Sequence, residues 1–234
     1  MSRTVLITGG SRGIGLALAR SFHGRGSRVA VTHRSAKPPP DLLSVPCDVR
    51  DHESVEAAFA QVEAAYGPVE ILVANAGVTD DAVMTQMTEE RFTQVLDTNL
   101  VGAYRVARRA VPSMVRARWG RIVFISSTTG LSGARGQTNY AASKAGLVGL
   151  ARSLALELGP YGVTANVVTL GYIDTEMTAD LTDQRRRQLI DRIALGRPAQ
   201  PEEATGIVRW LAGDEAGYVT GAVFAVDGGL GMGH

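Results

Sequence analysis

Residues 4–15, TVLITGGSRGIG, join an apolar run to a glycine-rich turn. The β-branched and apolar residues 4–8 predict a buried strand of a parallel sheet. Glycines at 9, 13 and 15 give the spacing Gly-x-x-x-Gly-x-Gly, and residues 16–22, LALARSF, then indicate a helix. This succession is the context that a dinucleotide-binding loop requires, because backbone N–H groups at the helix start face the pyrophosphate. A plain strand-to-helix turn is the alternative.

Further apolar runs of strand length alternate with helical patterns along the chain. We expect strands at residues 28–32, 43–47, 71–74, 120–125, 163–168 and 223–226, and helices at 51–66, 88–118, 139–159 and 201–212. Residues 35–40 predict a short proline-rich connector, and residues 173–195 a loop-helix lid over the site. The alternation predicts one α/β domain over residues 1–234, a Rossmann-type doubly wound parallel sheet of about seven strands flanked by helices.

Composition is that of an ordinary soluble globular domain. The 234 residues are 45% hydrophobic and 20% charged, with a formal net charge of +1, so no global field favours nucleic acid or membranes. The apolar runs are far shorter than the ~20 residues of a membrane span. A single cysteine, Cys47, excludes an internal disulfide and fits a reducing cytoplasm. The four histidines form no ligand cluster, so we expect no metal.

The end of the second strand distinguishes between two nicotinamide cofactors. An acidic residue there would bind the ribose 2′-hydroxyl of NAD, whereas an arginine suits the 2′-phosphate of NADP. Arg34 follows this strand, and Arg12 lies within the glycine turn. Two guanidinium groups without a carboxylate favour NADP(H). The alternative is that Arg34 is a solvated loop residue.

Tyr140 and Lys144 lie four residues apart in a predicted helix, which places them on one face about one turn apart. A nearby ammonium group favours the phenolate and lowers the tyrosine pKa, so the pair is a candidate general acid/base. Taken alone, the pair is more simply explained as a chance feature of a surface helix. Asn99 is a poor helix former within a predicted helix and needs a partner. Ser127 follows the fifth strand, where ligands bind in open α/β sheets.

With these pieces placed, the chain resembles a classical short-chain dehydrogenase/reductase, and within that family the bacterial 3-oxoacyl-[acyl-carrier-protein] reductases of the mycobacterial mycolic-acid-elongation type. The resemblance covers essentially all 234 residues. It rests on residues 8–15, the Asn75-Ala76-Gly77 segment, Asn99, Ser127, the Tyr140 and Lys144 pair, and the ending 227–229, DGG. Residues 31–34, VTHR, and the terminus 226–234 carry the likeness to the mycobacterial branch.

The resemblance implies a role for each of these residues. Tyr140 would donate a proton to the developing alkoxide, and Ser127 would hydrogen-bond the substrate carbonyl. Lys144 would bind the nicotinamide ribose, and Asn99 would hold a water that relays protons. The positions expected to line the cofactor are Gly9, Ser11, Arg12, Gly13, Ile14, Gly15, Arg34, Asp48, Val49, Asn75, Ala76, Gly77, Tyr140, Lys144 and Ile173.

The implied activity is NADPH-dependent reduction of 3-oxoacyl thioesters, carried on acyl-carrier protein or CoA, by a homotetramer. Another ketone or alcohol as substrate, or a non-catalytic dinucleotide sensor, are the alternatives. Leu170 stands where the family usually has proline, which is expected to loosen the following loop. Ser132 stands where the mycobacterial branch has an aromatic residue, so chain-length preference is open. The arginines 185–187 indicate a solvated helix face, or else a contact for an acidic carrier protein.

Overall fold

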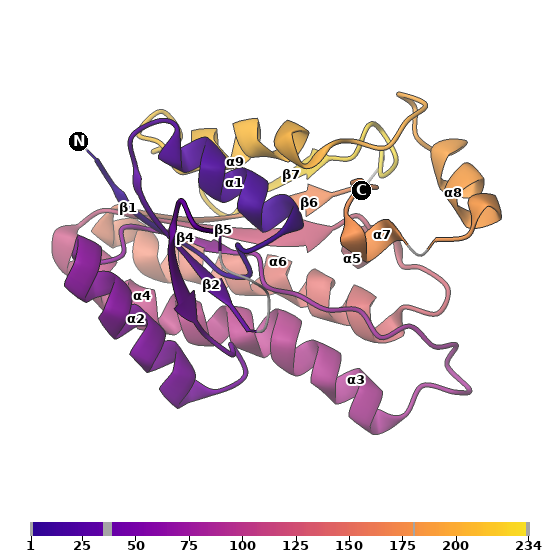
Figure 1. Ribbon diagram of the computed structural model, residues 1–234, viewed down its shortest axis with the longest axis horizontal. Coiled ribbons are helices and arrows are strands. Elements are labelled where there is room, and N and C mark those ends of the chain that lie inside the picture. The colour runs from indigo at the N-terminus through magenta and orange to yellow at the C-terminus, as the bar shows by residue number, and fades with distance from the viewer. Residues whose placement is uncertain (1, 35–38, 180, 233–234) are drawn as a thin grey trace.

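A seven-stranded parallel sheet forms the centre of the molecule (Figure 1). The computed structural model describes residues 2–34, 39–179 and 181–232. The strand order is β3-β2-β1-β4-β5-β6-β7, which confirms the doubly wound α/β fold. The strands are β1 (Thr4–Ile7), β2 (Arg28–His33), β3 (Leu43–Pro46), β4 (Ile71–Ala74), β5 (Gly120–Ser127), β6 (Val163–Leu170) and β7 (Val223–Val226). Most of the expected connector at 35–40 lies outside the described residues, as do the last two residues of the terminus.

Helices cover both faces of the sheet (Figure 1). Helices α1 (Gly13–His23) and α9 (Thr205–Leu211) pack on one face. Helices α2 (His52–Tyr66), α4 (Gly102–Ala117) and α6 (Thr138–Leu158) pack on the other. In β1, Leu6 belongs to one core cluster while Val5 and Ile7 belong to the opposite one. A strand buried on both faces gains by being apolar at every position, which explains the continuous apolar runs.

The helix expected at 88–118 is interrupted. It consists of α3 (Glu89–Leu96), a π-helical turn η1 (Asp97–Val101) and α4, and Arg118 ends it in the left-handed conformation with φ 51°. The turn η1 contains Asn99, whose side chain bonds outside the helix. A π turn inserts one extra residue into the helical ladder, a feature that is frequent at functional sites.

The fifth and sixth strands extend two residues further than expected. Leu170 pairs in register with Ser127 on one side and Val226 on the other. The N–H of Thr128 donates to the Leu170 carbonyl at 2.9 Å. Strand pairing therefore holds Leu170 itself in place without proline, and the looser loop expected after it stays a prediction.

The lid contains two short helices, α7 (Glu176–Ala179) and α8 (Asp183–Ile190), at the end of the sheet where the strands end (Figure 1). Of its expected apolar face, Ile193 is buried and Met177 is exposed; Leu181, Leu189 and Ile190 are half-buried. Across the described ranges, no helix combines the length and apolarity that crossing a membrane would need.

Candidate active site

The glycine turn between β1 and α1 leaves no room for side chains. Gly9 and Gly13 adopt positive φ angles of 63° and 50°, which glycine reaches without strain. A Cβ on Gly15 would lie 2.4 Å from the carbonyl oxygen of Gly9, and a Cβ on Gly9 would lie 3.0 Å from the Cα of Ala76. The bare backbone at the N-terminus of α1 therefore fits the close approach of a pyrophosphate. Ser11 and Ile14 of this turn are half-buried.

Side chains at the ends of three strands hold the glycine turn in place. The Asn75 amide donates to the carbonyls of Thr8 and Gly9 at 3.0 and 3.1 Å. The Thr8 hydroxyl accepts from the N–H groups of Asn75 and Ala76, both at 3.0 Å. The Thr32 hydroxyl accepts from the Gly9 N–H at 3.1 Å. Asn75 thus shapes the turn, and sequence reasoning missed Thr8 and Thr32, although a hydroxyl at the end of a strand is a recognisable signal.

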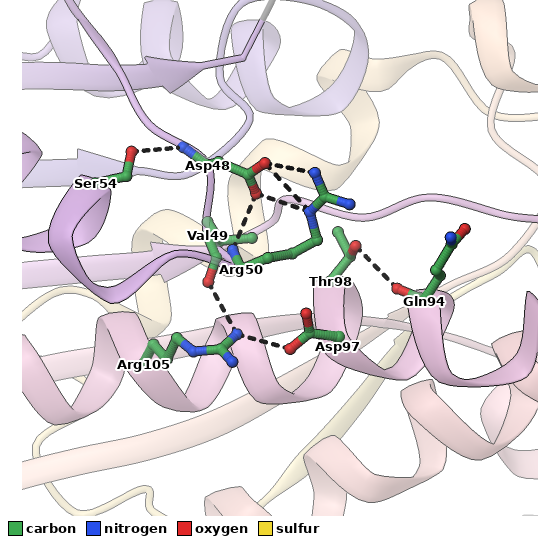
Figure 2. Close-up of polar contacts among 8 residues, drawn as sticks. All are labelled: Asp48, Val49, Arg50, Ser54, Gln94, Asp97, Thr98 and Arg105. Carbon is green, nitrogen blue, oxygen red and sulfur yellow. Dashed lines mark hydrogen bonds and ion pairs between the residues drawn. The ribbon is translucent and has the colours of Figure 1, made fainter. Parts of the chain in front are cut away.

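The ends of β2 and β3 form the edge where the adenosine of a dinucleotide is expected. Arg34 is exposed there and lies within electrostatic reach of the Asp48 carboxylate. Arg50 donates to both carboxylate oxygens of Asp48, at 2.6 to 3.2 Å (Figure 2). This pairing lowers the pKa of Asp48 to about 2. Val49 is buried, with its side chain against the backbone of Gly102.

The lid reaches back to the glycine turn. Arg12 forms an ion pair with Glu176 of α7 at 2.8 Å, and both side chains are mostly exposed. Thr175 lies 3.6 Å from where a Cβ on Gly13 would stand. Ile173 is buried at the base of the lid, and its carbonyl accepts from the Thr178 hydroxyl at 2.9 Å. The lid thus closes one side of the expected pyrophosphate site.

Tyr140 and Lys144 share one face of α6, as expected. The Lys144 Nζ lies 5.7 Å from the centre of the Tyr140 ring and donates to the Ile125 carbonyl at 2.8 Å. Burial lowers the pKa of Lys144 to about 8. Burial raises the pKa of Tyr140 to about 12, and a hydrogen bond with the Ser127 side chain opposes that shift. The direction for Tyr140 is opposite to the one that the pair alone predicts, because loss of hydration dominates the shift and the Ser127 side chain opposes it only in part.

Asn99 is 1% exposed and all its side-chain bonds are internal. Its Oδ1 accepts from the Val78 N–H at 2.8 Å, and its Nδ2 donates to the Val78 carbonyl and the Ser143 hydroxyl, both at 3.0 Å. A Cβ on Gly77 would lie 3.3 Å from Asn99 Oδ1 and 3.4 Å from Lys144 Nζ. Asn99, Gly77 and Lys144 therefore meet at one point. Ser143 was missed by sequence reasoning, although it precedes Lys144.

The site as a whole brings Ser127, Tyr140, Lys144 and Asn99 together at the carboxyl ends of the strands. Ser127 is the last residue of β5, and the Ser126 hydroxyl beside it donates to the Lys144 carbonyl at 2.9 Å, which fixes α6 against β5. In the part of the chain that the structure describes, no three His, Cys, Asp or Glu side chains are grouped to hold a metal ion. The arrangement offers a phenol, a hydroxyl and a buried amine around one point, which suits proton transfer to a carbonyl oxygen.

Comparison with known proteins identifies the family of the chain. The family model described as Enoyl-(Acyl carrier protein) reductase matches residues 9–231. With a seven-stranded Rossmann-type sheet and this set of side chains, the chain belongs to the short-chain dehydrogenase/reductase family of oxidoreductases.

Individual relatives within this family are described by a particular activity. The chain is 51% identical over 234 residues to the 3-oxoacyl-[acyl-carrier-protein] reductase MabA of Mycobacterium avium, covering 100% of this chain and 92% of that protein. It is 38% identical to the 3-oxoacyl-[acyl-carrier-protein] reductase FabG of Escherichia coli, covering 98% of each. A solved structure described as a putative gluconate dehydrogenase from Agrobacterium tumefaciens matches with a TM-score of 0.93 and 30% identity, over 98% of this chain and 96% of that one.

Proposed function

We propose that the protein is an NADPH-dependent reductase of 3-oxoacyl thioesters, which it converts to 3-hydroxyacyl thioesters in fatty-acid biosynthesis or elongation. The observation that carries the proposal is the convergence of Ser127, Tyr140, Lys144 and Asn99 beside a glycine turn that fits a dinucleotide. The two 3-oxoacyl-[acyl-carrier-protein] reductases that share 51% and 38% identity supply the substrate class.

The reaction adds a hydride to the ketone carbon and a proton to its oxygen. A bound nicotinamide cofactor supplies the hydride, and the protein positions the ketone and handles the proton. Ser127 donates a hydrogen bond to the carbonyl oxygen, and Tyr140 gives its phenolic proton to that oxygen as negative charge develops there. Lys144, buried beside Tyr140, stabilises the resulting phenolate. Asn99 holds the backbone at Val78 and the helix α6 in register.

Two arginines support the choice of NADPH over NADH. Arg34 is exposed at the end of β2, where the 2′-phosphate of the cofactor is expected. Arg12 lies in the glycine turn and now pairs with Glu176, from which a phosphate could displace it. Asp48 does not oppose a phosphate strongly, because Arg50 neutralises its carboxylate.

Assembly and location are further parts of the proposal. We propose a homotetramer that uses the long helices and the last strand, acts in the cytoplasm and reduces an acyl group that stays attached to acyl-carrier protein or CoA. Apolar side chains exposed on these helices support the assembly: Val101 and Tyr104 around the start of α4, and Leu156 on α6. Closed assemblies of even number are the general expectation for such chains. The basic residues 185–187 on the lid suit an acidic carrier.

The deciding experiment is the oxidation of NADPH with acetoacetyl-CoA, with NADH as the comparison and Tyr140→Phe as the blank. We expect turnover with NADPH, much less with NADH, and a loss of at least about 100-fold in the variant because the proton donor is gone. Cofactor binding without turnover would point to another ketone, such as a sugar acid. If neither cofactor bound, the dinucleotide assignment would be wrong.

A further inference from the structure

The π turn that carries Asn99 is held by contacts with the helical residues on both sides of it. The N–H of Gly102 donates to the Asp97 carbonyl five residues back, which closes the wide turn. The Thr98 hydroxyl donates to the Gln94 carbonyl at 3.1 Å (Figure 2). The carboxylate of Asp97 accepts from Arg105 at 2.8 Å. This ion pair spans eight residues and so encloses the whole turn, unlike the usual pairs three or four residues apart.

Arg105 also contacts the loop that follows β3. The same Nη1 atom that bonds Asp97 donates to the Val49 carbonyl at 3.3 Å (Figure 2). The side chain of Arg105 is 23% exposed, so this bridge lies in a partly buried position. One guanidinium group therefore connects the loop of Asp48 and Val49 to the turn of Asn99.

The same loop is packed rigidly against the start of α4. A Cβ on Gly102 would lie 2.6 Å from the Val49 Cγ2 atom, so the Val49 side chain rests directly on the Gly102 backbone. Asp48, the preceding residue, is fixed by Arg50 and by the Ser54 hydroxyl, which accepts from the Asp48 N–H at 2.9 Å. A small displacement of this loop cannot be absorbed locally, because close-packed contacts transmit it to α4.

We propose that Arg105 is a positioning residue that couples the adenosine end of the cofactor site to the π turn that carries Asn99. The inference rests on the proposed function, in which the loop of Asp48 and Val49 borders the adenosine. Occupation of that edge restrains this packed loop further, and Arg105 passes the constraint to Asp97, two residues before Asn99. Binding at one end of the cofactor thereby sets the geometry at the other.

A matched control lies one helical turn further along α4. Arg109 has a side chain of nearly the same exposure, 24%, and pairs with two carboxylates of α2, those of Glu56 and Glu63, at 2.7 Å each. Arg109→Gln removes ion pairs of the same helix without touching the π turn. Arg105→Gln removes the bridge itself. Asp97→Asn keeps an acceptor for Arg105 while losing the charge. It replaces Arg105→Gln in both tests if that variant folds poorly.

The first test measures hydrogen exchange of the backbone amides at residues 97–102, with and without adenosine 2′,5′-bisphosphate, which has no nicotinamide. We expect the ligand to slow exchange of this segment in the wild type and in Arg109→Gln, and to leave it unchanged in Arg105→Gln. Asp97→Asn should show a reduced effect. An equal effect in Arg105→Gln and wild type, or no effect in the wild type, would overturn the proposal.

The second test measures NADPH-dependent reduction of acetoacetyl-CoA by the same variants. Arg105→Gln should lower kcat about tenfold at an unchanged KM for the thioester, because a misplaced Asn99 affects the reacting geometry rather than thioester binding. Arg105→Lys, which keeps a cation near Asp97, should recover part of kcat, and Arg109→Gln should stay within about twofold of wild type. A loss in Arg109→Gln equal to that in Arg105→Gln would show general damage and overturn the proposal.

The two tests separate failure of this inference from failure of the proposed function. If the wild type shows the exchange effect but reduces no 3-oxoacyl thioester, the substrate assignment fails and the coupling stands. If the wild type reduces the thioester but Arg105→Gln matches it in both measurements, the coupling fails and the function stands.

Discussion

At Lys144, burial favours the neutral amine, whereas stabilising a phenolate on Tyr140 requires the charged amine. The amine donates to the Ile125 carbonyl inside the molecule, and burial lowers its pKa to about 8 from its ordinary value of 10.5. Tyr140 keeps its proton across the physiological range, because burial raises its pKa to about 12. The pair therefore stands with the phenol protonated, which is the form that a proton donor in ketone reduction needs.

The first prediction concerns pH. Above pH about 8, Lys144 loses its charge and no longer stabilises the phenolate, so kcat for ketone reduction should fall with a single ionisation near that value. The measurement is kcat for acetoacetyl-CoA reduction at constant ionic strength. It covers about pH 6 to 10, roughly two units on either side of the Lys144 pKa. A rate that rises through this range would contradict the assignment.

The free energy of unfolding should rise with pH as Lys144 loses its proton, whereas kcat falls. A pKa lowered by folding means that the unfolded chain binds more protons between pH 8 and 10.5, so the free energy of unfolding rises with pH there. Lys144→Met should lack this rise. Denaturant unfolding of both proteins at several pH values checks the prediction, and equal pH dependence in the two would contradict it.

A substitution of Arg34 tests the proposed preference for NADPH over NADH. Arg34→Ala should raise KM for NADPH about tenfold and leave KM for NADH nearly unchanged, because a hydrogen bond between charged groups contributes about 1.5–3 kcal/mol. Steady-state kinetics with both cofactors provide the measurement. The Arg34 guanidinium would have no part in cofactor choice if both KM values moved together.

Among the elements, the glycine turn between β1 and α1 leaves little space for a larger residue. Gly15→Ala would place a Cβ 2.4 Å from the Gly9 carbonyl oxygen and 2.6 Å from the Asn75 amide. We expect a loss of about 1–3 kcal/mol in the free energy of unfolding, as for overpacking elsewhere, together with loss of NADPH binding. Thermal unfolding and titration with NADPH measure the two effects.

Gly206→Ala in α9 is the matched control, since a Cβ there meets no atom within 4 Å. The Gly206→Ala substitution should raise the free energy of unfolding by about 0.5–1 kcal/mol, because alanine is a better helix former than glycine. NADPH binding should not change. A comparable loss in both variants would show that the substitution, rather than crowding at the turn, is responsible.

The sequence predicts these elements well where one local rule operates. The last strand, residues 223–226, is found at its expected bounds, because a short apolar run between glycines leaves few choices. The π turn at Asp97–Val101 was not expected, since the partners that Asn99 bonds, Val78 and Ser143, lie far away in sequence. The raised pKa of Tyr140 was missed for a similar reason, because burial depends on the packed fold and not on the spacing from Lys144.

For the whole molecule, the exposed apolar side chains of α4 and α6 lead to a prediction about assembly. Leu156 is 83% exposed on α6. Leu156→Glu would bury a charge in the proposed interface and should shift the protein from tetramer towards smaller species while preserving its circular dichroism. Light scattering after gel filtration measures the mass. An unchanged mass would place the contact elsewhere, and a monomeric wild type would contradict the tetramer.

The interior position of β1 in the sheet has a consequence for how the chain acquires its fold. β1 pairs with β2 on one edge and with β4 on the other, where Val5 lies opposite Ile71. During synthesis β1 precedes β4, so its second edge has no partner until more than sixty further residues have followed. Pairing of such distant segments is slow, and unpaired edges are prone to aggregate. Until β4 has been synthesised, one edge of β1 therefore has no partner strand and is open to wrong pairing.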